Sequence, residues 1–239
     1  MLVRRLGVTF IVVATMTGWL LSAMPAWAGD VSGSLAVTTD YLYRGLSQTA
    51  GKPAAQAGIQ FHSLEGWNVG AWGSSVDFQN GAGIAYELDL HAGYSWSLSP
   101  DWSMQLGYVH YGYLDDNDAG YDYDEVNASI SYQQRATASI AWSPNTSKHT
   151  YWGFISEKRA LAYELSLLQP LDPRWSLCAG VGYYDLSDLV DTGYWYWSTG
   201  VAFTWQGMQV DLLHIDTDST AGRLFDGGSR WTAALTWRF

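Results

Sequence analysis

Histidine and carboxylate side chains are the groups in this sequence most suited to chemistry. Glu87, Asp89 and His91 alternate along one segment, so they would share one face of a β-strand, where the imidazole could titrate beside two carboxylates. A serine hydrolase would also need a nucleophilic serine within hydrogen-bonding reach of a histidine, and the sequence contains no Gly-x-Ser-x-Gly motif. We therefore predict that His91 is a solvated or salt-bridged lining residue and that the chain has no catalytic site.

A second group of carboxylates lies in the acidic segment 115–124, which could attract Ca²⁺ by charge. The segment departs from the EF-hand loop, because no glutamate stands at its twelfth position. We predict a solvated acidic loop, with no metal site and no cofactor, whose carboxylates could meet lipopolysaccharide through bridging divalent cations.

The first 28 residues are predicted to be a secretory signal peptide. Arg4 and Arg5 precede an apolar run, and Ala26-Trp27-Ala28 has the small-x-small pattern of a cleavage site. A single transmembrane helix is the alternative, but Thr15, Thr17 and Gly18 interrupt the run. We expect cleavage after Ala28 and one folded domain over residues 29–239.

The charge of the mature chain excludes a nucleic-acid partner. Removal of two arginines from the 12 basic residues leaves ten against 23 acidic residues, a net charge of −13. Such a chain has no basic surface to neutralise phosphates. A single cysteine, Cys178, cannot form a disulfide within the chain, so an exported protein of this kind needs another source of stability.

Alternation of apolar and polar residues runs through most of the mature chain and predicts β-strands. From Tyr86 to Leu98, the apolar residues occupy one face and the polar residues the other. Twelve such segments are expected, at 31–44, 54–63, 67–78, 85–97, 102–114, 124–132, 136–143, 159–168, 175–184, 194–205, 208–215 and 230–239. The registers of 67–78 and 194–205 stay open, because in each the apolar face is ambiguous.

The connections between these segments alternate in length. Short turns follow the even-numbered segments, and longer acidic connections follow most odd ones, including 144–158 and 216–229. This asymmetry is typical of outer-membrane barrels, whose short turns are periplasmic. An even strand number then places both termini in the periplasm. We predict an all-β, antiparallel up-and-down transmembrane barrel of about 12 strands in the bacterial outer membrane.

Alternation alone does not distinguish this barrel from a soluble one with its apolar face inward. Tryptophans concentrate at segment ends, where the two interfaces of a bilayer would lie. The charged residues fall almost entirely on one face, as lipid requires of the other. The polar face would therefore line the lumen.

Several blocks of the sequence resemble the TorF-type porin family. They are DYLYRGLSQT (Asp40–Thr49) with the following Pro53–Gly58, the block Gly66–Phe78, and the block Glu87–Tyr94. The resemblance covers the N-terminal third and implies an outer-membrane porin-like protein without catalytic residues. The terminal Phe239 resembles the aromatic signal read by the outer-membrane assembly machinery.

The leading hypothesis is a passive pore for small hydrophilic solutes or ions, with a mild cation preference. The alternative is a closed structural or adhesin barrel that acts through its acidic loops, and a lipid hydrolase is third. Arg44 is expected to end the first strand beside Arg230 near the outer mouth, with Glu87 and Asp89 a quarter-turn or more around the wall, in an open or a plugged lumen. The predicted pore-lining residues are Arg44, Glu87, Asp89, His91, Glu164, Asp211, Arg230 and Arg238. Partners would be lipid, lipopolysaccharide, the assembly machinery and the solutes; the oligomeric state stays open.

Overall fold

The computed structural model describes residues 29–78, 84–114, 121–151 and 154–239. Within them, twelve strands close into an antiparallel barrel, and a separate two-stranded hairpin is formed by β2 (Leu42–Tyr43) and β3 (Leu46–Ser47). The barrel strands are β1 (Asp30–Thr38), β4 (Ala54–His62), β5 (Trp67–Ser75), β6 (Tyr86–Ser97), β7 (Trp102–Leu114), β8 (Tyr123–Tyr132), β9 (Ala136–Tyr151), β10 (Phe154–Pro170), β11 (Trp175–Leu186), β12 (Thr192–Trp205), β13 (Met208–Thr217) and β14 (Arg230–Arg238).

Each barrel strand pairs with its neighbour in the chain, and β1 closes the ring by pairing with both β4 and β14. Full closure satisfies the backbone hydrogen bonds of the first and last strands, which would otherwise be exposed edges. The predicted fold class, a closed antiparallel barrel, is confirmed. No helix of the described residues is long and apolar enough to cross a membrane.

The boundaries of three predicted segments, 31–44, 136–143 and 159–168, are wrong. The first strand ends at Thr38 rather than at residue 44, because the chain turns inward there. Strands β9 and β10 extend far into the predicted loop 144–158 and pair with each other almost to their tips, with a register shift between Lys158 and Ala160. A protruding two-stranded ribbon therefore replaces most of that loop.

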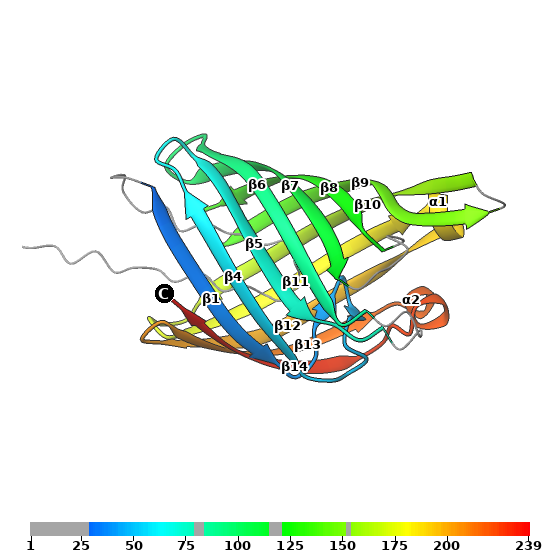
Figure 1. Ribbon diagram of the computed structural model, residues 1–239. Coiled ribbons are helices and arrows are strands. Elements are labelled where there is room, and N and C mark those ends of the chain that lie inside the picture. The colour runs from blue at the N-terminus through cyan, green and yellow to red at the C-terminus, as the bar shows by residue number, and fades with distance from the viewer. Residues whose placement is uncertain (1–28, 79–83, 115–120, 152–153) are drawn as a thin grey trace, which may run out of the picture.

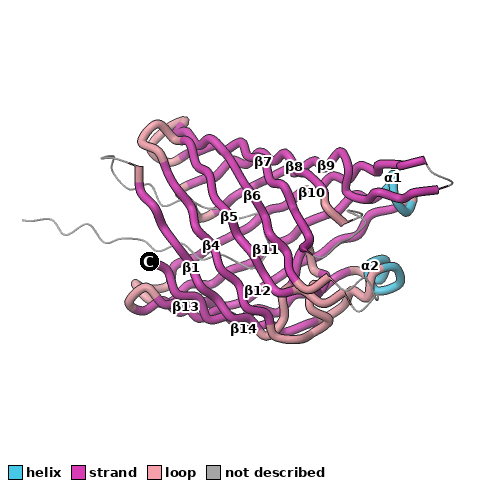
Figure 2. Tube along the Cα trace, in the orientation of Figure 1, coloured by secondary structure: helices cyan, strands magenta, loops and turns pink. Residues whose placement is uncertain are grey.

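The two ends of the barrel differ, as the connection lengths predict. Short turns join β4 to β5, β6 to β7, β8 to β9, β10 to β11 and β12 to β13 at the end where the C-terminus lies (Figure 1). We call this the short-turn end. The opposite, long-connection end contains the helices α1 (Ser187–Val190) and α2 (Ser219–Leu224) (Figure 2). The inward hairpin, β2–β3, is also part of the connection at this end.

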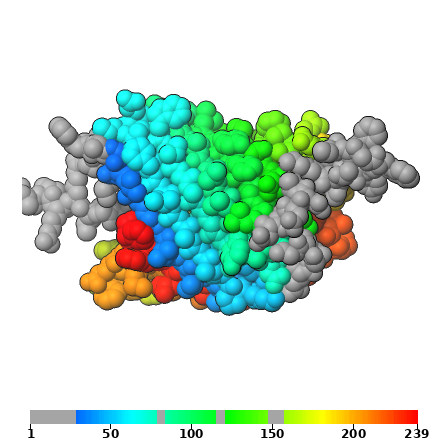
Figure 3. All heavy atoms as spheres, viewed as in Figure 1, coloured from blue at the N-terminus to red at the C-terminus, as the bar shows by residue number. Residues whose placement is uncertain are grey.

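The outer face of the barrel is apolar and the inner face polar. On β6, Leu88 and Leu90 are exposed, whereas Glu87 and Asp89 are buried. Tryptophans such as Trp67 and Trp231 are exposed near the strand ends, as in the aromatic belts of membrane barrels. The side chains over β1, β4 and β5 form a closely packed outer surface (Figure 3). Lipid, not water, is the solvent that suits such a surface.

The two ambiguous registers are now resolved. On β5, Val69 points outward and Trp72 inward, where its ring packs edge-on against Tyr41 at 5.5 Å. On β12, both faces are aromatic because Tyr194 and Tyr196 are buried in the lumen while the adjacent tryptophans face outward. In both strands, aromatic residues on the inner face contact other groups inside the barrel rather than lipid.

Candidate functional site

The connection between β1 and β4 folds into the barrel instead of projecting from it. Its tip is a two-residue turn at Arg44 and Gly45, which have φ angles of 49° and 82°. Positive φ at both central positions is the backbone of a type I′ turn, and glycine adopts it without strain. Leu42 and Tyr43 pair with Ser47 and Leu46 across this turn. The prediction that Arg44 ends the first barrel strand is therefore wrong.

Hydrogen bonds at its base hold the hairpin in a fixed position. The carboxylate of Asp40 accepts hydrogen bonds from the hydroxyls of Ser47 (2.5 Å) and Thr49 (2.9 Å). The hydroxyls of Thr38 and Thr232 both donate to the backbone carbonyl of Asp40, at 2.8 and 2.9 Å. The base is therefore fixed to β1 and β14 before the chain enters the lumen.

Arg44 forms the central contact of the hairpin. Its Nη2 donates to the Glu125 carboxylate on β8 at 2.7 Å, and the two side chains are 1% and 2% exposed. The guanidinium also lies over the rings of Tyr43 and Tyr184, at 4.7 and 4.5 Å from their centroids. Burial opposes the charge of Arg44, but Glu125 and the surrounding tyrosines raise its pKa above the ordinary value. A buried, charge-assisted pair of this kind fixes an orientation.

The backbone and apolar side chains of the hairpin contact other walls of the barrel. Leu42 is 1% exposed and packs with Cys178, Leu213 and Ile215 on β11 and β13. The hydroxyl of Tyr194 on β12 donates to the carbonyl oxygen of Arg44 at 3.0 Å. The hairpin is thus packed between walls, not suspended in an empty bore.

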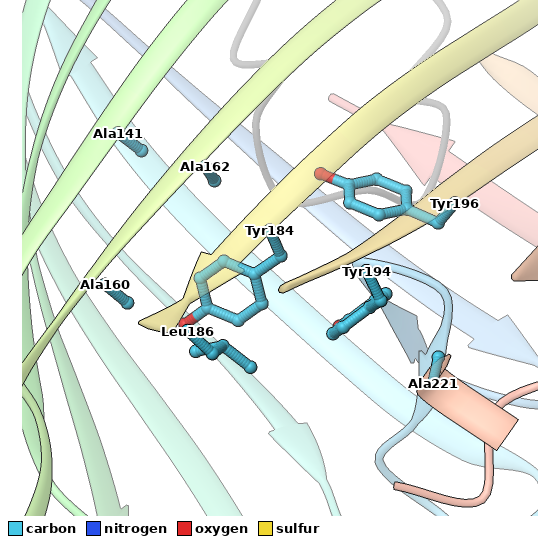
Figure 4. Packing of buried hydrophobic residues seen from close by; sticks show 8 residues of the cluster. All are labelled: Ala141, Ala160, Ala162, Tyr184, Leu186, Tyr194, Tyr196 and Ala221. Carbon is cyan, nitrogen blue, oxygen red and sulfur yellow. The ribbon is translucent and has the colours of Figure 1, made fainter. Parts of the chain in front are cut away.

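Tyrosines and small residues line the lumen next to the hairpin. Tyr184 and Tyr194 come from adjacent strands, with ring centroids 5.9 Å apart. Figure 4 shows them pointing into the same space as Ala221 of α2, with Ala141 and Ala162 on the wall beside them. Small side chains on β9 and β10 leave room for the large ones on β11 and β12.

Glu87, Asp89 and His91 face the lumen, as their alternation indicates, and all three are buried. Glu87 accepts a hydrogen bond from the hydroxyl of Tyr113 at 3.4 Å. Neither carboxylate oxygen of Asp89 has a hydrogen-bonding partner among the described protein atoms. These groups lie on the wall next to the hairpin, since Asp89 pairs across the sheet with Trp72 and Tyr111.

The remaining predicted lining residues are distributed over the bore. Glu164 accepts a hydrogen bond from the Tyr196 hydroxyl on the inner face. Asp211 is held by the side-chain amide of Gln209 at 2.7 and 2.8 Å, and Arg238 donates to the carbonyl oxygen of the same amide at 2.7 Å. The two sets lie on different walls, so no single cluster unites the predicted residues.

Arg230 lies at the long-connection end of β14, near the base of the hairpin. Its guanidinium is 3.9 Å from Asp40 and 3.2 Å from Asp226. β14 and β1 are neighbours, as expected from closure of the ring. The expected side-by-side placement of Arg44 and Arg230 at the mouth is replaced by an arrangement in which Arg44 has moved into the lumen and pairs with Glu125.

Glu125 is the most important lumen residue missing from the predicted set. Its position on the polar face of its segment could have predicted that it faces the lumen, because the polar face of β8 points inward. Nothing local in the sequence indicates its partner, since Arg44 lies 81 positions away. The pair depends on the inward fold of a connection that alternation alone predicts to be strand.

Histidines and aspartates outside the lumen serve local roles. His110 pairs with Asp124 at 2.9 Å near the rim, and His214 hydrogen bonds to Ser229 at 2.7 Å. Asp122 accepts from the backbone N–H of Tyr113 at 2.8 Å. The rest of the predicted acidic loop, 115–120, lies outside the described residues, as does the predicted signal peptide. The described side chains contain no cluster of three or more potential metal ligands.

Solved structures with a similar fold are outer-membrane porins. A KdgM porin superposes with a TM-score of 0.52 at 8% identity, covering 87% of this chain and 99% of that one. The KdgM porin in complex with disordered oligogalacturonate gives 0.51 at 7% identity, over 89% and 99%. With the apolar outer face, this fold confirms the predicted outer-membrane barrel.

Sequence comparison gives a family but no activity. No curated protein matches the chain. A family model described as "Bacterial protein of unknown function (Gcw_chp)" matches residues 22–237. That description does not include the TorF-type name, so the finer resemblance stays a prediction. With nine-tenths of its length matched, the chain belongs to the Gcw_chp family of bacterial proteins.

Proposed function

We propose that this protein is an outer-membrane channel for small hydrophilic solutes or ions. The observation that carries the proposal is the sorting of the twelve-stranded wall, which is apolar outside and charged inside. Barrels of about eight strands are filled by their own side chains, and those of 16–18 strands leave an aqueous channel. A twelve-stranded barrel lies between these sizes, so it can enclose both a folded segment and a narrow passage.

The charges of the lumen favour cations. Among the described residues, six carboxyl groups face the bore or the hairpin, against three guanidiniums; they are Asp40, Glu87, Asp89, Glu125, Glu164 and Asp211 against Arg44, Arg230 and Arg238. Rings of acidic side chains favour cation passage. A polyanionic sugar such as the oligogalacturonate bound by the KdgM porin would meet net repulsion here. We therefore assign uncharged or cationic small solutes to this channel.

Planar-bilayer recording tests this function on the purified, folded protein. Discrete conductance steps are expected, with a reversal potential in a salt gradient that indicates mild cation selectivity. Absence of steps would contradict the channel, and a reversal potential on the chloride side would contradict the charge argument. Swelling of liposomes in sugars and amino acids of graded size would then define the solutes.

A closed barrel that acts through its outer loops is the second candidate. The burial of the inward hairpin favours it, because the hairpin occupies the lumen at the level of Arg44. Such a protein would neither conduct nor swell liposomes, yet would bind an external surface through its long connections. Binding of cells or lipopolysaccharide by the folded protein, lost on shortening the β9–β10 ribbon, would support it.

The orientation and processing of the chain follow from the channel assignment. We propose that residues 1–28 are removed as a signal peptide, and that the short-turn end faces the periplasm. Mass spectrometry of the membrane-extracted protein should then give Gly29 as the first residue. A cysteine at the short-turn residue Asp172 should resist a membrane-impermeant thiol reagent in intact cells and react in lysed cells.

A further inference from the structure

The inward hairpin contacts walls on opposite sides of the barrel. Trp72 on β5 packs against Tyr41, and Glu125 on β8 pairs with Arg44. On the far side, Tyr184 of β11 lies under the same guanidinium. β5 and β11 are six strands apart in the closed ring of twelve, so the hairpin reaches across the bore. At this level hairpin side chains, as well as those of the wall, occupy part of the lumen and narrow it.

The hairpin is not needed to close the barrel. Thr38 and Ala54, the residues that flank the connection, are already paired across β1 and β4. Two strands joined at such a pair need only a two-residue turn. The fifteen residues 39–53 therefore form an insertion into the bore whose removal leaves every barrel strand and its register in place.

Arg44 and Glu125 supply the charged contact that keeps the hairpin inside. The guanidinium is the positive charge at the hairpin tip, and it has 1% exposure. Removing Glu125 would leave that charge buried without a counter-charge, a state that buried ions avoid by moving to water. The tip could reach water only by moving away from the wall, because the rings of Tyr43 and Tyr184 cover the guanidinium.

We propose that the β2–β3 hairpin is the constriction of the channel, and that Arg44 and Glu125 set the size limit of its solutes by holding the hairpin across the bore. This inference rests on the proposed channel function and identifies its selectivity element. The native protein passes only small solutes and conducts weakly. Release of the hairpin enlarges both the conductance and the size limit.

Three variants of the whole protein are compared with the native protein in planar bilayers and liposomes. In the first, residues 39–53 are replaced by Asn-Gly. The second carries Glu125→Gln, which keeps the side-chain shape but removes the charge. The control is Asp188→Asn, which breaks an ion pair with Arg159 of the same 2.7 Å length whose side chains are 68% and 42% exposed. Strand content by circular dichroism verifies folding before each measurement.

The expected results separate the constriction from the channel itself. The shortened protein should conduct several-fold more than the native one and admit larger sugars, Glu125→Gln should lie between them, and the control should match the native protein. Equal conductance and size limit in the native and shortened proteins would overturn the constriction and leave the channel standing. Absence of conductance in the folded, shortened protein would overturn the channel itself.

A charge exchange tests the same contact without removing the hairpin. Glu125→Arg opposes Arg44 with a like charge and should raise the size limit. The double variant Arg44→Glu/Glu125→Arg restores opposite charges and should return the limit to its native value. An unrestored limit in the folded double variant would overturn the role of this pair, and restoration would support it even if the shortened chain does not fold.

Discussion

The energetic strength of the Arg44–Glu125 contact can be measured with a double-mutant cycle. The cycle consists of Arg44→Gln, Glu125→Gln and the double variant, so that the coupling of the two charges is separated from other losses. Because both side chains are almost fully buried, little solvent screening weakens their interaction. We expect strong coupling between the two positions.

The coupling free energy of Arg44 and Glu125 can be estimated from the burial of the pair and from the rings that surround it. Removing one partner of a buried ion pair costs about 3–5 kcal/mol. The two ring contacts of the guanidinium persist in Glu125→Gln, and each stabilises a desolvated cation by about 0.5–2 kcal/mol. A coupling of about 3 kcal/mol is therefore expected, or about a hundredfold in the equilibrium between docked and released hairpin.

Loss of the Arg44–Glu125 contact should release the hairpin from the wall at lower denaturant concentration than is needed to unfold the barrel. The ladder of β1 with β4 and β14 does not include the hairpin, so the barrel can stay folded while the hairpin leaves the wall. Reaction of Leu42→Cys with a thiol reagent, in a Cys178→Ser background, reports release of the hairpin. Denaturant unfolding in detergent micelles reports the global stability. Thiol reactivity should rise strongly in Glu125→Gln, with a smaller change in global unfolding.

The exposed pair Arg159–Asp188 provides the comparison. Its nitrogen–oxygen distance is also 2.7 Å, but both side chains face solvent. Its own cycle should show no coupling above experimental error, because solvent screens such pairs. A coupling at Arg44–Glu125 no larger than that of the exposed pair would refute the reasoning, as would unchanged thiol reactivity at position 42.

Three further predictions test the wall, the charge of the bore and assembly. Leu90→Arg places a charge on the lipid face of β6 and should destabilise the barrel by about 2–4 kcal/mol in lipid unfolding experiments, whereas Leu98→Arg beyond the strand end should cost only about 0–1 kcal/mol; equal costs would argue against the lipid-facing belt. Glu164→Gln should move the reversal potential toward the non-selective value, because this half-buried carboxylate lies on the inner face, while Asp172→Asn in a short turn should leave it unchanged, and an unaltered potential in the first variant would exclude Glu164 from the conducting path. Phe239→Ser should reduce the amount of barrel assembled in cells yet leave the unfolding midpoint of the refolded protein nearly unchanged, because the ring is 63% exposed and lies on the outside of the barrel against Trp237 and Gly33; an equal loss of stability would assign the ring a structural role instead.

Most of the barrel follows from the sequence because its main physical constraint is local. A strand between lipid and a polar lumen must alternate residue by residue, and the alternation of Tyr86–Leu98 is sufficient to place β6 and its inward carboxylates. The short turns are equally local, since Gln206 and Gly207 alone join β12 to β13 with positive φ angles of 49° and 80°. The number of strands, the order in which they pair and the face of each strand that points into the lumen can therefore be predicted from this sequence alone.

The inward hairpin cannot be predicted in this way, because its position depends on contacts with residues that are distant in the sequence. No glycine or proline interrupts the sequence between Thr38 and Arg44, so the sequence-based prediction extends the first strand through this stretch. The Arg44–Gly45 pair does fit the positive-φ turn that ends this stretch, but a turn signal alone does not say whether the hairpin points outward or inward. That direction is fixed by Glu125, Tyr184 and Tyr194, each at least 81 positions from Arg44.

The position of the hairpin gives physical meaning to the block that most resembles a porin family. A barrel wall can be built from many alternating sequences, and its outer residues need only be apolar. The stretch from Asp40 to Thr49 instead needs particular groups: a carboxylate at the base, a guanidinium at the tip and an adjoining glycine that turns the chain. A specific sequence is therefore required where the chain enters the lumen and packs against its walls. The segment with this requirement is the hairpin, which is the proposed constriction of the channel. On this reasoning, the residues that distinguish this channel from other barrels lie in the hairpin and its receptor on β8, and substitutions there should change permeation more than substitutions of equal size on the wall.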